Sequence, residues 1–293
     1  MSPVAWLADH LPARRRLVAK FETAHARRLT LGSDGIVIGA ESIRLDAPGG
    51  RAALLLHGFN DTPQSMVHLA RALHGAGWTV SVPRLPGHGV SLAAMARDSR
   101  AHLWHTTVER TYAELRASND VVVVCGQSMG GALAVQFAAA HHELPALVLL
   151  APYLGMPLAV QFRVVTSWLW DVVIPYRASS GGERSLHDPE AKAQTLGPGV
   201  ITSRTMSALR TVARSAERAL PRVTAPTLYL QSREDNRISS RDAERHFAML
   251  GSQAKVQRWV SGCGHIISAD YCRDAVAQQV IEWFGRHASV AEI

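Results

Sequence analysis

The sequence predicts an α/β fold, a mostly parallel sheet with helices on both faces. From Glu41 onward, short aliphatic runs alternate with segments of helical periodicity, which is the pattern of strands joined by crossover helices. The runs are not interrupted by polar residues, which is typical of strands that are buried on both faces. A chain of 293 residues that is 47% hydrophobic and 19% charged has the composition of a globular protein, which excludes disorder and fibrous repeats.

Three regions follow from this pattern. Residues 1–40 are predicted to be a helical extension, with an arginine-bearing helix at about 12–28. Residues 41–152 and 221–293 are predicted to form the α/β core. Residues 153–220 contain several prolines and no convincing strand, and they are predicted to be a cap inserted over a pocket. The alternative for this last region is an ordinary packed excursion without a lid function.

The core is expected to contain short strands and the helices between them. The aliphatic runs place strands at 52–57, 79–82, 121–125, 146–150, 227–230 and 256–260. The periodic segments place helices at 64–74, 101–115, 130–141, 240–249 and 272–284.

The motif with the most chemical content is Gly-Gln-Ser-Met-Gly-Gly at 126–131, between an expected strand and an expected helix. A serine on such a sharp turn adopts a strained backbone, and the flanking glycines remove side chains that would collide there. The turn presents Ser128 at the carboxyl edge of the sheet and directs a helix N-terminus toward it. Ser128 is therefore the predicted nucleophile, and the alternative is a glycine-rich turn that carries an idle serine.

A nucleophilic serine needs a base, and the base needs an acid to orient it. If the nucleophile follows an early strand, the acid is expected after a later strand and the histidine after the last one. Asp235 and His265 occupy these places. Glu234 is the rival acid, but neighbours on an extended chain point in opposite directions, and Asp235 is followed three residues later by the apolar Ile238.

Two backbone amides are expected to hold the oxyanion that forms during attack. Gly58 permits a tight turn that exposes the amide of Phe59, and the amide of Met129 follows the nucleophile. One such donor typically contributes about 3 kcal/mol of transition-state stabilisation. The alternative is that this loop is a strand-to-helix turn in which Asp61 or Thr62 caps the next helix. The loop can have both roles at once.

Charge and motif content limit the partners and cofactors. The net charge of +7 comes from scattered arginines, without a basic track interleaved with aromatic residues, so no nucleic-acid partner is expected. The chain has no HExxH motif and no Cys/His cluster, so no catalytic metal and no cofactor are expected. The arginine-bearing N-terminal helix and the apolar cap leave contact with a membrane surface open.

The three cysteines form none of the CxxC pairs that mark zinc or redox sites, so no disulfide framework is expected. Cys263, two residues before His265, is interpreted as a small packing residue. The N-terminus lacks the long apolar segment and cleavage site of a secretory signal. A reducing, cytoplasmic setting is therefore expected.

Taken together, five loops resemble those of the α/β-hydrolases, and within them those of bacterial carboxylesterases and monoacylglycerol lipases with a short cap. The resemblance covers most of residues 51–284. It implies that Ser128 is the nucleophile, that Asp235 and His265 are acid and base, and that the Phe59 and Met129 amides form the oxyanion hole. The loops are His-Gly-Phe at 57–59 with Thr62-Pro63, Pro-Gly-His-Gly at 86–89, the motif at 126–131, Arg-Glu-Asp-Asn-Arg-Ile at 233–238, and Gly-Cys-Gly-His-Ile-Ile at 262–267.

The expected reaction is hydrolysis of carboxylic esters, monoacylglycerol-like or with medium-length acyl chains, through an acyl-enzyme intermediate. An apolar pocket would exclude heavily charged substrates. The same triad also serves C–C bond hydrolases, thioesterases and acyl transferases, and a non-catalytic hydrolase fold that binds a ligand is a further alternative. The predicted pocket residues are Leu154, Met156, Val165, Trp168 and Ile174.

Overall fold

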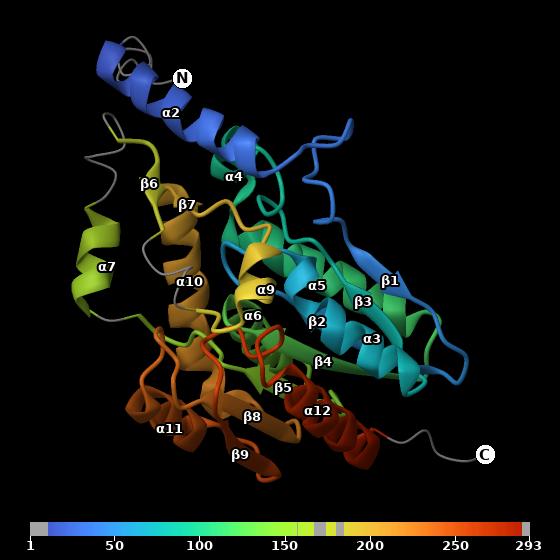
Figure 1. The fold of residues 1–293 in the computed structure, drawn as a ribbon. Coiled ribbons are helices and arrows are strands. Elements are labelled where there is room, and N and C mark those ends of the chain that lie inside the picture. The colour runs from blue at the N-terminus through green and yellow to red at the C-terminus, as the bar shows by residue number, and fades with distance from the viewer. Residues whose placement is uncertain (1–10, 157, 167–173, 180–184, 289–293) are drawn as a thin grey trace.

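The computed structural model describes residues 11–156, 158–166, 174–179 and 185–288. Its centre is a seven-stranded sheet with helices on both faces (Figure 1), which confirms the predicted α/β architecture. Within this sheet the edge pair β1–β3 is antiparallel and the other neighbouring pairs are parallel. In spatial order the strands are β1 (Ile43–Leu45), β3 (Thr79–Val82), β2 (Arg51–Leu56), β4 (Val121–Gln127), β5 (Leu147–Leu150), β8 (Thr227–Ser232) and β9 (Lys255–Val260).

Strand β4 shows why the aliphatic runs form the centre of the sheet. Its successive side chains point to opposite faces, because the side-chain period of a strand is two. Val122 and Val124 belong to the hydrophobic cluster on one face, and Val123 and Cys125 belong to the cluster on the other. Both faces are therefore buried, which explains the absence of polar residues in the run.

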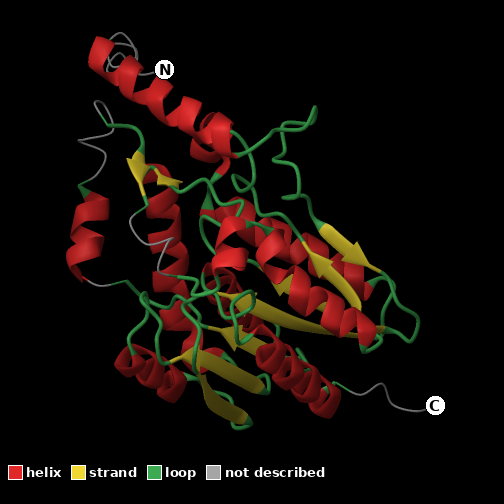
Figure 2. Cartoon of the chain, in the orientation of Figure 1, coloured by secondary structure: helices red, strands yellow, loops and turns green. Residues whose placement is uncertain are grey.

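Helices α3 and α12 pack on one face of the sheet, and α5, α6 and α11 pack on the other (Figure 2 shows the two layers). Helix α6 is apolar around most of its circumference and has Gln136 as its one polar side chain, which is typical of a helix that is buried on nearly all sides. The helices span η1 (Pro63–Met66), α3 (Val67–Gly75), α5 (Ala101–Arg116), α6 (Met129–Ala140), α11 (Ser240–Met249) and α12 (Arg273–His287).

The elements predicted for the core are all present, and two short ones were missed. Strand β1 has three residues and lies at the edge of the sheet, and helix α4 (Leu92–Asp98) has seven. The predicted N-terminal helix is α2 (Pro12–Arg28). Its Val18 and Phe21 pack against a buried cluster that contains Leu92 and Met95 of α4, so this helix is joined to the body of the protein by apolar contacts.

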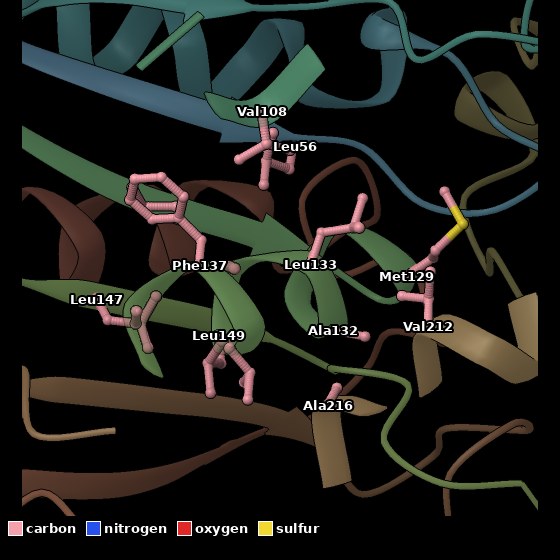
Figure 3. Close-up of a cluster of buried hydrophobic side chains, with 14 of the residues drawn as sticks. Leu56, Val108, Met129, Ala132, Leu133, Phe137, Leu147, Leu149, Val212 and Ala216 are labelled. Carbon is pink, nitrogen blue, oxygen red and sulfur yellow. The ribbon is translucent and has the colours of Figure 1, made fainter. Parts of the chain in front are cut away.

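The interval between β5 and β8 was expected to contain no strand, and this was wrong, because two two-residue strands pair there. Helix α10 begins with a capping box between Thr202 and Thr205 and packs on α6. Val212 and Ala216 of α10 lie beside the apolar face of α6 in Figure 3. The elements of the interval are α7 (Leu158–Val165), β6 (Arg177–Ala178), α9 (Pro189–Ala193), β7 (Val200–Ile201), α10 (Ser203–Ala219) and η3 (Leu220–Arg222).

The expectation of unpaired cysteines was wrong. Cys263 and Cys272 form a disulfide with their Cα atoms 5.9 Å apart, and Cys125 is buried and free. The pair is nine residues apart in sequence and is brought together by the turn that contains His265. The predicted cytoplasmic setting loses the support that it drew from the cysteines. In the described part of the chain, none of the helices combines the length and apolar character that crossing a membrane requires.

Candidate active site

Ser128 stands at the junction of β4 and α6 with φ 55° and ψ −115°, in the left-handed region that disfavours side chains. The glycines around it are sterically required. A Cβ on Gly126 would collide with the carbonyl group of Gly130, and a Cβ on Gly130 would collide with the carbonyl group of Leu56. This turn places the serine at the carboxyl edge of the parallel strands, where the loops after β2, β8 and β9 also begin.

His265 joins Ser128 to Asp235. The Ser128 Oγ lies 2.8 Å from His265 Nε2, and His265 Nδ1 lies 2.7 Å from Asp235 Oδ2. With the ring proton on Nδ1, the imidazole donates to the carboxylate and accepts from the serine hydroxyl. The side chain of Asp235 is fully buried, and that of His265 is only 8% exposed. The three residues therefore form a continuous hydrogen-bonded chain in which the acid and the base are buried and the serine is half-buried.

Glu234, the rival acid, faces elsewhere. Its Oε1 accepts a hydrogen bond from the Gly262 amide at 2.7 Å, and its Oε2 lies 3.5 Å from His187 Nδ1. The two neighbouring carboxylates have different partners, although Glu234 lies in a turn after β8 and not on the extended chain that the sequence argument assumed. Glu234 thus contacts the histidine loop at its backbone, while Asp235 contacts the imidazole.

The surroundings of Asp235 keep its carboxyl group ionised. Burial alone would raise its pKa, but the neighbouring His265 and hydrogen bonds to the carboxylate outweigh this effect and lower the pKa. The amides of Arg237 and Ile238 donate to Oδ1 at 2.7 and 3.0 Å, and Gln231 Nε2 donates to Oδ2 at 2.7 Å. An ionised carboxylate in this position stabilises a protonated imidazole.

Two polar side chains that the sequence did not single out hold the histidine loop. Gln127, next to the nucleophile, is fully buried and donates from Nε2 to the carbonyl oxygen of His265 at 3.0 Å. Ser232 donates from Oγ to the carbonyl oxygen of Cys263. Both lie at the ends of buried strands, where a polar residue in an apolar run is the signal that could have identified them.

The loop after β2 lies against the nucleophile. A Cβ on Gly58 would lie 3.4 Å from the Cβ of Ser128, so the backbone that carries the Phe59 amide is near the serine, and Met129 follows the serine directly. Buried His57 fixes this loop, because its Nδ1 contacts the Gly58 carbonyl oxygen at 2.9 Å and its Nε2 accepts from the Leu85 amide at 3.1 Å.

Asp61 is a further carboxyl group in this loop. Its side chain is buried, and burial raises its pKa to about 6 in spite of opposing hydrogen bonds and the nearby His265. Its Oδ1 accepts from the Thr62 amide at 2.8 Å. Thr62 is the N-cap residue of η1, as the alternative reading of this loop had it, but no side chain makes a capping hydrogen bond to that helix.

The predicted pocket residues are separated in the structure. Leu154 and Met156 are buried in the cluster that contains Met129, and the neighbouring Tyr153 amide donates to the carbonyl oxygen of Ser128 at 3.0 Å. Val165 and Ile174 are 52% and 38% exposed, and Val165 lines an open cavity of about 590 Å³ between α5, α7 and α10. Trp168 lies outside the described residues.

The described residues contain no group of three or more His, Cys, Asp or Glu side chains placed to hold a metal ion. The groups that the structure does bring together at the site are the serine hydroxyl, the imidazole, the carboxylates and the backbone amides.

Comparison with known proteins gives a consistent result. The family model Hydrolase_4, described as "Serine aminopeptidase, S33", matches residues 50–271. A thermostable monoacylglycerol lipase from Bacillus sp. (strain H-257) is 29% identical over 236 residues, which cover 80% of this chain and 90% of that protein. A carboxylesterase from Bacillus subtilis (strain 168) is 25% identical over 236 residues, with 80% and 92% coverage. A solved structure from work on the metagenome-derived lipolytic enzymes LipS and LipT superposes with a TM-score of 0.78 at 29% identity, and covers 85% of this chain and 98% of the other.

Proposed function

Since the chain belongs to the Hydrolase_4 family of serine hydrolases and is a carboxylic ester hydrolase, we propose that Ser128 is its nucleophile, His265 its general base and Asp235 the acid that orients the base. The observation that carries the proposal is the hydrogen-bonded chain from Ser128 Oγ through the imidazole to the Asp235 carboxylate. Nucleophilic catalysis by serine requires a base within this distance and a third group that orients the base.

The reaction follows from this geometry. The Ser128 Oγ attacks the ester carbonyl carbon while His265 Nε2 takes the hydroxyl proton, and Asp235 stabilises the resulting imidazolium. The amides of Phe59 and Met129 hold the negative oxygen of the tetrahedral intermediate. The ester C–O bond then breaks, and the imidazolium gives its proton to the leaving alcohol. Water, activated by the same histidine, hydrolyses the acyl-serine and releases the carboxylic acid.

The proposed substrates are monoacylglycerol-like esters or esters with acyl chains of medium length. Leu154 and Met156 support this class of substrate, because both are apolar and lie near the nucleophile in the chain's path. They come shortly after Tyr153, whose amide donates a hydrogen bond to the Ser128 carbonyl oxygen. The name of the monoacylglycerol lipase relative agrees with a monoacylglycerol-like substrate, and the name of the carboxylesterase relative agrees with a carboxylic ester. Residues 153–220 are proposed to form the cap over the acyl group. The same proposal includes contact between the cap and a lipid surface.

The test is hydrolysis of p-nitrophenyl esters of increasing acyl length by the native protein and by Ser128→Ala. We expect turnover that is fastest at medium chain length and falls by at least about a thousandfold in Ser128→Ala. Ser118→Ala, which changes an exposed serine between α5 and β4, is the control and is expected to keep native turnover. Turnover that survives in Ser128→Ala would disprove the assignment of the nucleophile, and a preference for acetyl esters would disprove the substrate class.

A further inference from the structure

A further buried carboxylate, that of Asp270, lies five residues after His265. Asp270 is fully buried and accepts hydrogen bonds from backbone amides of two separate segments. Its Oδ2 accepts from Gly264 at 2.7 Å and from His187 at 2.8 Å, and its Oδ1 accepts from Asp188 at 2.8 Å and from Tyr271 at 2.9 Å. Two of these donors belong to the histidine loop, and two belong to the insertion between β5 and β8.

The four amides keep this carboxyl group charged. Burial alone would raise the pKa of Asp270, but the backbone hydrogen bonds, that of Gly264 first among them, outweigh burial and lower the pKa. Hydrogen bonds to an ionised acceptor are roughly twice as strong as those between neutral groups. Asp270 therefore ties the amide next to His265 firmly to the insertion.

The segment of the insertion that reaches Asp270 comprises residues 185–188, which we call the strap. The strap contacts the loops of both the base and the acid. The carbonyl oxygen of Ser185 accepts from the Ile266 amide at 3.0 Å, one residue after the base. Its hydroxyl lies 3.2 Å from Asn236 Oδ1 and 3.2 Å from Arg237 Nε, directly after the acid.

We propose that Asp270 and the strap position His265 against Ser128 and Asp235, so that the insertion supports the triad in addition to covering the site. This inference rests on the proposed function. Asp270 touches none of the reacting atoms and acts as a positioning residue through the backbone on either side of the imidazole. Misplacement of a catalytic group by about 1 Å can lower the rate by a factor of about 100, which makes a charged anchor at Gly264 consequential.

The first test is Asp270→Asn. In either orientation the Asn side chain offers an oxygen to two of the four amides and turns its NH2 group toward the other two. We expect kcat to fall by about 10- to 100-fold while KM for a p-nitrophenyl ester stays within about twofold of the native value. Asp242→Asn, which alters a surface carboxylate beside Ser239 on α11, is the control and is expected to keep both constants.

Hydrogen exchange provides a readout that does not depend on activity. The peptide that contains Gly264 is expected to exchange faster in Asp270→Asn than in the native protein, while the strands of the sheet keep their native exchange rates. Faster exchange with a native kcat would overturn the proposal, and so would a raised KM with a native kcat, because that result would assign the insertion to substrate binding alone.

If Asp270→Asn does not fold, Ser185→Ala is used to test the proposal instead. It removes the hydroxyl between Asn236 and Arg237 and leaves the carbonyl group that binds the Ile266 amide. We expect kcat to fall by about 2- to 10-fold at unchanged KM, and an unchanged kcat would overturn the proposal. Failure of the proposed function can be distinguished from failure of this inference. If the proposed function is wrong, Ser128→Ala keeps the native turnover, whatever the result with Asp270→Asn and Ser185→Ala.

Discussion

Asp61→Asn is predicted to stabilise the protein at alkaline pH and to have little effect in acid. The carboxyl group is buried beside the nucleophile, and burial raises its pKa from 3.8 to about 6. The folded state therefore binds this proton more tightly than the unfolded state does. Below about pH 4 the carboxyl group is protonated in both states and adds no penalty. As the pH rises from 4 through 6, the unfolded chain releases the proton first, so the free energy of unfolding falls.

The size of the effect follows from the shift. About two pKa units at 1.36 kcal/mol each correspond to about 3 kcal/mol of lost stability above pH 7. Asparagine cannot ionise, and its side-chain oxygen can still accept from the Thr62 amide, as Asp61 does at 2.8 Å. The substitution should thus recover most of this free energy at pH 8 and almost none at pH 4.

The assay is urea unfolding at pH 4 and pH 8, followed by tryptophan fluorescence, because Trp78 and Trp104 are buried in the two clusters of the core. Asp46→Asn serves as the control, since the Asp46 side chain is 73% exposed and its ion pair with Arg44 lies at the surface, so the substitution should change the free energy of unfolding by less than about 1 kcal/mol at either pH. An Asp61→Asn protein that is no more stable than the native protein at pH 8, or equally stabilised at both pH values, would refute the reasoning.

Three further predictions concern the site and its loops. Asp235→Asn should lower kcat by about 10⁴-fold because the imidazole loses its orienting carboxylate, whereas Glu234→Gln should stay within about tenfold; p-nitrophenyl ester kinetics compare the two. Gly130→Ala should prevent folding or lower the free energy of unfolding by more than about 4 kcal/mol in urea, because its Cβ would overlap carbonyl oxygens at the end of β2. Gly285→Ala, where a Cβ meets nothing within 4 Å, is the matched control and should be neutral or stabilising. Joint replacement of Cys263 and Cys272 by serine should lower the free energy of unfolding by about 3 kcal/mol, the chain-entropy value for so short a loop, and the double variant should no longer respond to a reducing agent.

The parts of the fold that could be predicted from the sequence are those that periodicity and local sterics determine. The valine run of β4 and the glycines around Ser128 have one structural solution, because the run must be buried on both faces and the turn excludes side chains. Strand β1 lacked such a signal. It has three half-buried or exposed residues on the edge of the sheet, and its pairing with β3 depends on tertiary contact.

The parts of the site that the sequence did not predict depend on backbone groups and on loop paths. The partners of Asp270 are backbone amides, which every residue type except proline provides. No sequence motif can therefore predict them. The Cys263–Cys272 pair likewise has no distinctive spacing and exists because the turn around His265 returns the chain to the start of α12. Composition and motif reasoning identified the reacting groups but not the scaffold that holds them.

His57, His88 and His265 differ in their surroundings, and the difference shows why His265 is placed to act as a base. His57 has both ring nitrogens engaged by backbone groups, and burial, aided by neighbouring His88, holds its pKa well below the usual range. Burial likewise lowers the pKa of His88 to about 4. Neither ring has a carboxylate partner among the described ion pairs, so a proton taken from a serine would leave an unstabilised buried charge. His265 has a carboxylate on Nδ1 and the nucleophile on Nε2. Chain order selected this histidine from the sequence, and the physical reason is that its buried charge has a counterion.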